Sequence, residues 1–286
     1  MIHTGSDKSD NKKIINAMTI DVEDWYHSVT SIPFNEWHKY EDRVEQCTNK
    51  ILNILKTFQT KATFFCLGYI AEKYPKLIEA IKQDGHEIGT HGFAHQLVYD
   101  LTPNEFRKDL KKSVKVLEQV TGENILGYRA PYWTITKDSY WALDIIADEG
   151  LKYDASIYPI KTYMYGIPGS PIYPYEIDLE HNKKLLEIPP TVVKYFGRRV
   201  PVAGGFYLRA LPYKFVKFAL RKVNSFDKPA VVYLHPPEID PDKPKLKLPP
   251  REKILHYYNL ATIESKLIHL LKDFKFSSIK NIFLSK

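Results

Sequence analysis

Strand-like and helix-like segments alternate along the first half of the chain, and this alternation constrains the fold more than any other feature of the sequence. Short runs rich in apolar and β-branched residues lie at residues 14–22, 61–68 and 125–132, and longer stretches with apolar residues at helical spacing separate them. Such alternation is typical of parallel β/α units, in which a helix returns the chain to the start of the next strand. The sequence therefore predicts an α/β fold around a parallel sheet.

Capping signals define the predicted helices. In the clearest case Thr102 is the N-cap, Pro103 occupies the first helical position, Glu105 the capping-box position, and Gly122 ends the helix. Further helices are predicted for residues 41–58, 71–85, 136–150, 214–223 and 251–274. A late strand is expected to end at His235.

The regular alternation breaks in residues 158–212, which are rich in Pro, Tyr and Gly. We interpret this segment as an extended insertion with short strands and a turn at Gly204 and Gly205. The chain has 286 residues, of which 44% are hydrophobic, enough for one large α/β domain. We therefore predict a polar tail over residues 1–13 and a single domain over residues 14–286, with a C-terminal extension from about residue 158.

The charge pattern does not predict a nucleic-acid interface. The net charge is +7, but 41 Lys and Arg residues are interleaved with 34 Asp and Glu residues. The densest basic stretch, residues 243–253, is interpreted as a solvated Pro-rich loop. The alternative is a weak contact with anionic lipid or a phosphorylated glycan carrier.

No segment of the sequence predicts a passage through a membrane. Residues 1–13 are polar and lack the apolar core of a signal peptide, and no later run approaches about 18 uninterrupted apolar residues. We therefore expect a cytoplasmic protein, a placement that still allows peripheral contact with a membrane surface.

The segment THGFAH, residues 90–95, predicts a metal site. It places His91 and His95 four residues apart, so a helical segment would turn both imidazoles toward one ion. A mononuclear hydrolytic site usually has three protein ligands and one open position. The acidic cluster at the end of the first strand, Asp21, Glu23 and Asp24, is the best source of the missing carboxylate.

Six motifs together resemble a known family. The order of TIDVED, ATFFCLG, GHEIGTHGFAH, YRAPY, YDAS and YLHP is similar to that of the polysaccharide deacetylases, the NodB-homology group of carbohydrate esterase family four, over about residues 14–240. The segments AGGFYLRALPY, HPPEID and HYYNLATIESKL resemble the C-terminal extension of a subgroup linked to bacterial exopolysaccharide and exosortase loci. The resemblance implies a distorted (β/α)7 barrel, a divalent metal that is most often zinc, and removal of an acetyl group from an N-acetylated sugar.

The resemblance also implies roles for the metal-site residues. Asp21 matches the general base, and His91 and His95 match two metal ligands. Many family members have two adjacent aspartates where this chain has Asp21 followed by a valine, so the third ligand departs from the common pattern. Strand alternation places Glu23 on the same face as Asp21 and makes it the first choice, while Asp24 stays open if the chain turns earlier.

The remaining roles concern the base, the oxyanion and the leaving group. Arg129 resembles the residue that pairs with the base, and Tyr132 the residue whose backbone N–H contributes to the oxyanion hole. His235 matches the general acid, and Asp154 resembles the carboxylate that tethers its imidazole.

We therefore expect a hydrolase that deacetylates an N-acetylhexosamine of a bacterial surface polysaccharide or its lipid-linked precursor. One alternative is a hydrolase of small cyclic amides such as allantoin, because some barrels of this superfamily act on them. Another is a non-catalytic glycan-binding relative, which would be expected to lack the base or the acid. Asp21 and His235 are both present.

Overall fold

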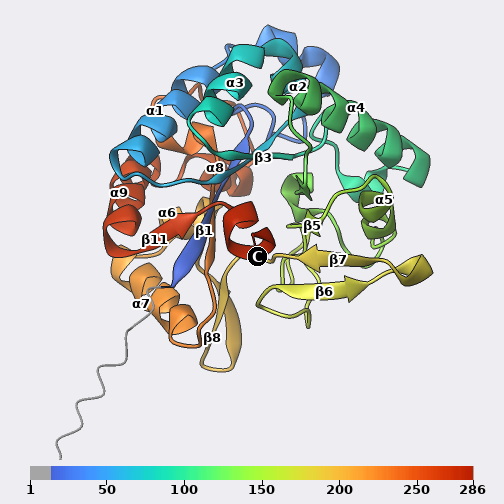
Figure 1. The fold of residues 1–286 in the computed structure, drawn as a ribbon. Helices are drawn as coiled ribbons and strands as arrows, with labels where there is room; N and C mark the ends of the chain where they lie inside the picture. Colours follow the sequence, from blue (N-terminus) through green and yellow to red (C-terminus); the bar gives the residue numbers. More distant parts are fainter. Residues whose placement is uncertain (1–13, 286) are drawn as a thin grey trace, which may run out of the picture.

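The computed structural model describes residues 14–285, and a nine-stranded sheet forms its centre (Figure 1). The strand order is β10-β1-β2-β3-β4-β5-β7-β6, with β11 also paired to β1. Every neighbouring pair is parallel except β6 and β7, which are antiparallel. The strands of this sheet are β1 Ile15–Val22, β2 Thr63–Cys66, β3 Glu87–Thr90, β4 Gly127–Tyr128, β5 Tyr153–Asp154, β6 Tyr175–Asp178, β7 Lys184–Glu187, β10 Val231–Leu234 and β11 Lys275–Ser277. The predicted tail over residues 1–13 lies outside the described residues.

Helices cover the outside of the sheet, and a small hairpin extends from it (Figure 1). The α-helices are α1 Val44–Thr57, α2 Gly68–Lys73, α3 Pro75–Gln83, α4 Pro103–Thr121, α5 Ala142–Asp148, α6 Gly205–Ala210, α7 Tyr213–Asn224, α8 Pro250–Tyr257 and α9 Ile263–Asp273. The hairpin pairs β8 Val192–Tyr195 with β9 Arg198–Pro201. Short helical turns complete the chain: η1 Phe34–Lys39, η2 Val98–Asp100, η3 Pro131–Trp133, η4 Glu180–Asn182, η5 Pro236–Ile239, η6 Leu260–Thr262 and η7 Lys280–Leu284.

The predicted parallel α/β fold is confirmed, but no strand ladder closes the sheet into a complete barrel within residues 14–285. Single hydrogen bonds link the two ends instead. The Thr191 N–H donates to the Val231 carbonyl at 3.1 Å, and the Val231 N–H donates to Thr191 Oγ1 at 2.7 Å. The barrel is therefore distorted between β7 and β10.

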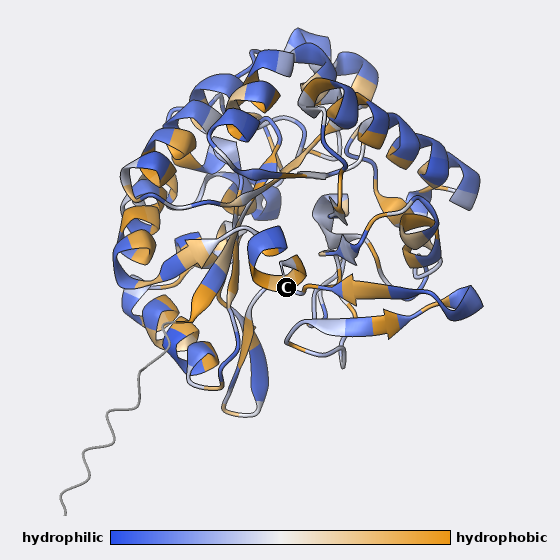
Figure 2. Cartoon of the chain, in the orientation of Figure 1, coloured by the Kyte–Doolittle hydropathy of each residue, from blue (hydrophilic) through white to orange (hydrophobic). Residues whose placement is uncertain are grey.

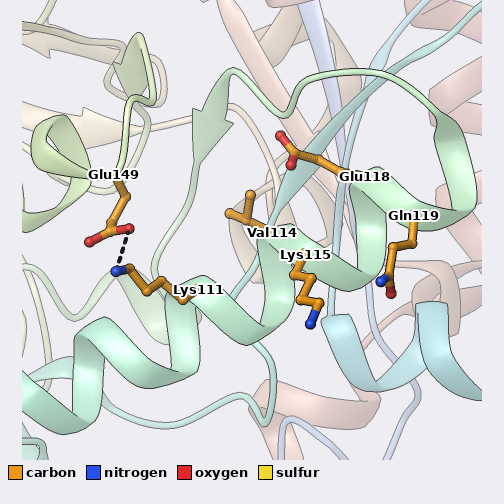
Figure 3. A pocket seen from close by; sticks show the side chains of 6 residues that line it. All are labelled: Lys111, Val114, Lys115, Glu118, Gln119 and Glu149. Atoms are coloured by element: carbon orange, nitrogen blue, oxygen red, sulfur yellow. Dashed lines mark ion pairs between the residues drawn. The ribbon is translucent and has the colours of Figure 1, made fainter.

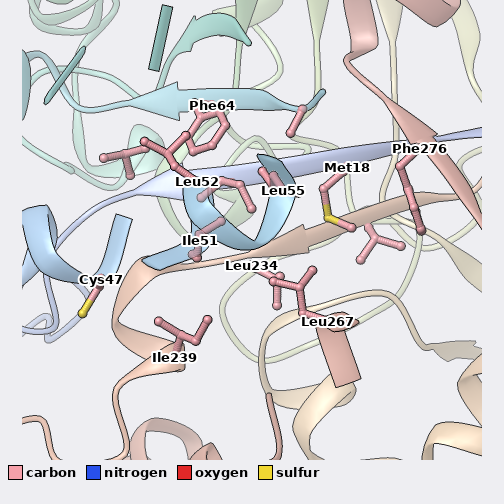
Figure 4. Close-up of a cluster of buried hydrophobic side chains, with 14 of the residues drawn as sticks. Met18, Cys47, Ile51, Leu52, Leu55, Phe64, Leu234, Ile239, Leu267 and Phe276 are labelled. Carbon is pink, nitrogen blue, oxygen red and sulfur yellow. The ribbon is translucent and has the colours of Figure 1, made fainter. Parts of the chain in front are cut away.

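Side-chain alternation along β1 separates the hydrophobic core from the barrel interior. Met18 and Ile20 point outward and pack against the covering helices, within a cluster that also contains Leu52 and Leu267 (Figure 4). Burying one such side chain fully contributes roughly 1.5–3 kcal/mol. Because successive residues of a strand face opposite sides, Asp21 is directed into the barrel.

The covering helices are amphipathic, with hydrophilic outer faces and hydrophobic inner stripes (Figure 2). None of the helices in the described part of the chain combines the length and the apolar character needed to cross a bilayer.

Apolar residues fill the barrel at the amino ends of its strands. Ala17, Phe65, Tyr153 and Ile279 belong to one buried cluster, and the Ile279 N–H donates to Thr63 Oγ1 at 2.8 Å. The C-terminal segment therefore closes this end of the barrel and leaves the carboxyl ends of the strands for a site.

Several predicted helices have different boundaries in the structure. The capping box of α4 and its left-handed end at Gly122 are confirmed. The helix predicted over residues 71–85 is broken at Tyr74, because Pro75 starts α3 there. The helix predicted over residues 251–274 is interrupted near Asn259, which has a φ of 56°.

The predicted turn at Gly204 and Gly205 is the start of helix α6, within a segment that we expected to be extended. A Cβ atom at Gly204 would lie 2.2 Å from the Tyr233 carbonyl oxygen. Only glycine allows this close approach between the start of α6 and strand β10.

Candidate functional site

Two hollows on the described surface, each of about 510 Å³, differ in the chemistry of their walls. One lies on the outer side of α4 (Figure 3), where Lys111 and Glu149 form an ion pair of 3.5 Å. Its walls contain no histidine, cysteine, serine or threonine. The other, here called the central pocket, lies at the carboxyl ends of the strands, and its wall includes Asp21, Glu23, His91, His95, Tyr132 and His235. The central pocket is therefore the candidate active site.

Glu23, His91 and His95 converge in the central pocket. One ligand atom from each lies within 4.8 Å of the others, and all three residues are buried. His95 Nε2 is 2.6 Å from Glu23 Oε2. His91 Nδ1 is 2.7 Å from the Arg129 carbonyl oxygen, which orients the ring and leaves Nε2 for another partner.

The expectation that the two histidines share one face of a helix is wrong. Residues 91–95 form a turn after β3, and His95 has a φ of 51°. The carboxylate of Asp109, on α4, anchors this turn by accepting from the N–H groups of Phe93 at 2.8 Å and Ala94 at 3.3 Å. The histidines thus meet through a strained turn, and such strain is common at functional sites.

This cluster fits a divalent metal such as zinc. Two imidazoles and one carboxylate form a ligand set that leaves a position for water. Burial lowers the pKa of His91 to about 4, so its imidazole is neutral at pH 7. Burial alone would raise the pKa of Glu23, but the charge of His95 and its hydrogen bond hold that pKa below its ordinary value. Both groups therefore have the deprotonated form that metal binding requires.

Asp24, the alternative third ligand, lies outside this cluster. Its Oδ2 accepts from the backbone N–H groups of Arg43 at 2.7 Å and Val44 at 2.9 Å, at the start of α1. Its Oδ1 accepts from the Trp25 N–H at 2.8 Å. Asp24 is thus committed to capping α1, and the structure places Glu23 with the histidines instead.

Asp21 meets Arg129 inside the barrel. Arg129 Nη1 donates to Asp21 Oδ1 at 2.7 Å and to Thr19 Oγ1 at 2.8 Å. The guanidinium lies between the rings of Phe65, at 4.2 Å, and Trp133, at 4.7 Å. The resulting ion pair is fully buried and holds the Asp21 carboxylate in one orientation.

His235 lies beside Asp21, with 3.7 Å between His235 Nε2 and Asp21 Oδ2. Its other nitrogen, Nδ1, is 3.1 Å from Glu238 Oε2, and Glu238 in turn accepts from Arg209 Nε at 2.9 Å. Burial alone would lower the pKa of His235, but the hydrogen bond and charge of Glu238, with the charges of Glu23 and Asp21, raise it to about 9. The imidazole is therefore protonated at neutral pH.

The prediction that Asp154 tethers His235 is wrong. Asp154 accepts from the Ser156 hydroxyl at 2.6 Å and its N–H at 3.2 Å, and it lies against Glu187. Glu238 contacts the His235 imidazole instead and was not among the predicted site residues. Its spacing of three residues from His235 is that of a capping box, which the structure contains.

Asp154 and Glu187 form a buried carboxyl pair at the ends of β5 and β7. Burial raises the pKa of both groups, and the charge of Asp154 raises that of Glu187 further. Two carboxylates this close cannot both ionise easily, so the pair keeps a proton to higher pH than separate carboxyl groups do.

This pair predicts a dependence of stability on pH. Because these pKa values are raised, the folded state keeps a proton that the unfolded state releases above about pH 4.5. The free energy of unfolding therefore falls as pH rises, by up to about 1.4 kcal/mol per pH unit. Glu187→Gln should therefore flatten this dependence, measured by urea unfolding between pH 5.5 and 8.5. Glu79→Gln, at an exposed position on α3, is the control and should behave like the wild type. Parallel curves for Glu187→Gln and the wild type would contradict the assignment.

Tyr132 lies in a tight turn on the pocket wall. It has a φ of 51° and a ψ of 21°, and the next residue, Trp133, also has a positive φ of 59°. The Tyr132 ring centroid lies 4.8 Å from that of His95. The turn therefore brings Tyr132 next to Glu23, His91 and His95, here called the metal-type cluster.

Two family descriptions match this chain in sequence. Residues 36–153 match the polysaccharide deacetylase family, and residues 155–284 match a domain of unknown function (DUF3473). A peptidoglycan-N-acetylglucosamine deacetylase of Bacillus cereus is 36% identical over 98 residues, which cover 34% of this chain and 36% of that protein. The chain thus matches only about a third of that relative's length.

Solved structures share the fold. A Mycobacterium smegmatis protein assigned to the polysaccharide deacetylases superposes with a TM-score of 0.64 at 21% identity, covering 96% of this chain and 90% of the other. Puue allantoinase superposes with a TM-score of 0.61 at 16% identity, with coverage of 96% and 90%. At such low identity these likenesses describe the fold alone. From the sequence matches, the chain carries a polysaccharide deacetylase domain over residues 36–153, followed by the domain of unknown function over residues 155–284.

Proposed function

We propose that this protein is a metal-dependent hydrolase that removes the N-acetyl group from an N-acetylhexosamine of a bacterial surface polysaccharide or its precursor, releasing acetate. The main support is the arrangement of Asp21 and His235 in the central pocket beside the metal-type cluster. Arg129 holds the Asp21 carboxylate, and Glu238 holds the His235 imidazole. Amide hydrolysis needs such a base and such an acid.

On the base side, Asp21 accepts a proton from the attacking water. Arg129 holds its Oδ1 at 2.7 Å, which leaves Oδ2 toward the pocket and His235. A zinc or similar divalent ion bound by Glu23, His91 and His95 would act as a Lewis acid on the amide carbonyl and on water. The Tyr132 backbone N–H is the proposed second donor to the oxyanion, and the position of its turn beside His95 supports this role.

On the acid side, His235 donates its proton to the sugar nitrogen, because an amine does not leave as an anion. Glu238 keeps the imidazole charged and oriented through Nδ1, and the proton that reaches the substrate comes from Nε2. Arg209 holds Glu238 and also donates to the Tyr258 carbonyl at 2.8 Å, so α8 supports the acid. The products are acetate and a free amino sugar.

The family's sequence likeness supports an acetylated glycan as the substrate, since the similar Bacillus cereus protein is named for N-acetylglucosamine in peptidoglycan. A glycan-binding protein without activity would not require Asp21 and His235 to be held by separate ion pairs, with Arg129 and Glu238. The alternative substrate is a small cyclic amide, and the assay below distinguishes it from an acetylated glycan.

The test is acetate release from N-acetylglucosamine oligomers by the zinc-loaded protein. His235→Ala should lower kcat by about 10²–10⁴-fold, the usual contribution of a general acid, and should keep the metal. His269→Ala, at an exposed position on α9, should have the wild-type rate. Full activity of His235→Ala would refute the role of the acid, and activity on allantoin without acetate release would favour the cyclic-amide alternative.

A further inference from the structure

Lys243 is a buried cation in the wall of the central pocket. It follows η5 in the basic stretch that we interpreted as a solvated loop, yet it is only 6% exposed, whereas Lys245 and Lys247 of the same stretch are exposed. The Tyr257 hydroxyl fixes the loop by accepting from the Leu246 N–H at 2.9 Å. The fold thus buries Lys243 of this loop in the pocket wall, while Lys245 and Lys247 stay exposed.

The Lys243 ammonium has no carboxylate within 4.0 Å among residues 14–285, and no hydrogen bond to it is formed there. The adjacent Asp242 is exposed and forms no ion pair with Lys243 among residues 14–285. Asp240, three residues before Lys243, is occupied by Arg43 Nη1 at 3.1 Å and by the Asp242 N–H at 3.1 Å. The Tyr257 ring, with its centroid 5.5 Å from Nζ, gives a weak cation–π contact. The Lys243 side chain is largely buried, so its ammonium has little water around it at the pocket wall, and a ligand that pairs with it would offset part of that desolvation cost.

The neighbouring side chains favour an anion as that ligand. Arg251 also lines the pocket, with its guanidinium stacked 3.7 Å from the Tyr163 ring centroid, an arrangement that leaves the N–H edges of the guanidinium for a second partner. Burial and the charge of Arg209 lower the pKa of Lys243 to about 8, so it keeps its charge at pH 7. Burial, together with the charge of Lys243, lowers the pKa of His256 to about 4, so this neighbour is a neutral donor or acceptor.

The acidic residues of the pocket do not fill this role. Glu238 is bound by Arg209 and His235, and Glu23 lies against His95. Glu252 lies on the same wall, but no cation is within 4.0 Å of it in the described part of the chain. Lys243 therefore remains a charge without a partner next to the candidate catalytic residues.

We propose that Lys243 binds a negatively charged group of the substrate, a carboxylate or a phosphate, so that the protein acts on an anionic acetylated glycan rather than a neutral one. This inference rests on the proposed deacetylase function and narrows its substrate class. The anion would come either from an acidic sugar within the chain or from the phosphate of a phosphorylated precursor, two sources with the same chemistry at Nζ.

Calorimetric titration of the zinc-loaded protein with three acetylated probes tests this proposal. The probes are N,N′,N″-triacetylchitotriose (chitotriose below), which is neutral, a hyaluronan tetrasaccharide, which carries carboxylates, and N-acetylglucosamine 1-phosphate. The wild type should bind at least one anionic probe about tenfold or more tightly than chitotriose, as expected for a charge-assisted hydrogen bond. Preference for the tetrasaccharide would indicate an acidic sugar, and preference for the phosphate would indicate a phosphorylated precursor.

Variants assign the preference to Lys243. Lys243→Gln should lower the ratio of anionic to neutral affinity about tenfold or more, Lys243→Arg should keep the preference, and Lys245→Gln should match the wild type in every titration. Equal affinity of the wild type for all three probes, or equal weakening of all three by Lys243→Gln, would overturn the proposal.

Acetate release, measured on the same samples, separates the anion-binding proposal from the proposed deacetylase function. Selective anion binding without acetate release would support the anion site and refute the deacetylase function. Equally efficient acetate release from all probes would support the deacetylase function and refute the anion site.

Discussion

Glu23→Gln is expected to remove the divalent metal from the purified protein and to lower acetate release by more than about 100-fold. An amide is a poor replacement for a carboxylate ligand, and even residues that only support metal ligands usually account for about 10–100-fold in affinity or activity. Glu23 is one of the three residues whose ligand atoms lie within 4.8 Å of one another, with His91 and His95. His91→Ala should have the same effect. The measurement is metal content by mass spectrometry after mild dialysis of all variants in one buffer.

Asp24→Asn is the matched control, because it changes the neighbouring carboxylate in the same way. This variant should keep about one metal per chain and lose stability instead, by about 0.5–2 kcal/mol, since Asp24 caps α1 through the Arg43 and Val44 N–H groups. The first quantity is metal content, and the second is the midpoint of urea unfolding. Loss of metal from Asp24→Asn with retention in Glu23→Gln would reverse our assignment of the third ligand.

Glu238→Gln is expected to lower kcat by about 10–100-fold at pH 8 and to move the alkaline limit of activity to lower pH. His235 must be protonated to act as the acid, and its raised pKa means that this form is present below the folded-state value and is lost as pH rises through it. The groups that raise this pKa are Glu238, Glu23 and Asp21, with Glu238 the largest contributor among them. Without the Glu238 charge the pKa of His235 falls, so the protonated fraction declines at a lower pH. The measurement is the pH profile of kcat.

Asp154→Asn is the control for this experiment, because the family resemblance assigns the tether to Asp154. Since Asp154 contacts Ser156 and Glu187 rather than His235, the variant should leave the alkaline limit where the wild type has it. Metal content should be unchanged in both variants. A shift caused by Asp154→Asn and none by Glu238→Gln would show that the resemblance predicts the tether better than the geometry does.

Both halves of the chain contribute to the candidate site, and the sheet brings them together. Strand β1 pairs with β10 in a register that sets Ile20 opposite Leu234, so the next residues, Asp21 and His235, are neighbours across the strands. The region that matches the polysaccharide deacetylases supplies the metal-type histidines, whereas the region that matches the domain of unknown function supplies His235, Glu238, Arg209 and Lys243. We infer that this C-terminal region completes the acid side of the site and its specificity.

The sequence by itself determined the parts of this protein that depend on local interactions. Helix α4 has the predicted capping box and glycine end because these hydrogen bonds join residues within one turn of each other. Strand alternation placed Asp21 and Glu23 on the same face, and both line the central pocket. The family resemblance implied that Arg129 pairs with Asp21, and the two side chains are hydrogen-bonded. The parallel α/β fold also followed, because alternating β/α units have few ways to bury their apolar faces.

Only the tertiary structure decided which side chains meet across the barrel. Asp24 caps a helix about twenty residues away, Glu238 replaces Asp154 as the partner of His235, and Lys243 is buried although its neighbours are exposed. Each outcome depends on where loops place a backbone N–H, an imidazole or an apolar wall. The local sequence is compatible with several of these placements, so it does not determine which side chains meet. A buried carboxylate accepts from whichever donor the packing leaves without a partner, because leaving a buried donor or acceptor unpaired costs more free energy than the difference between two possible partners.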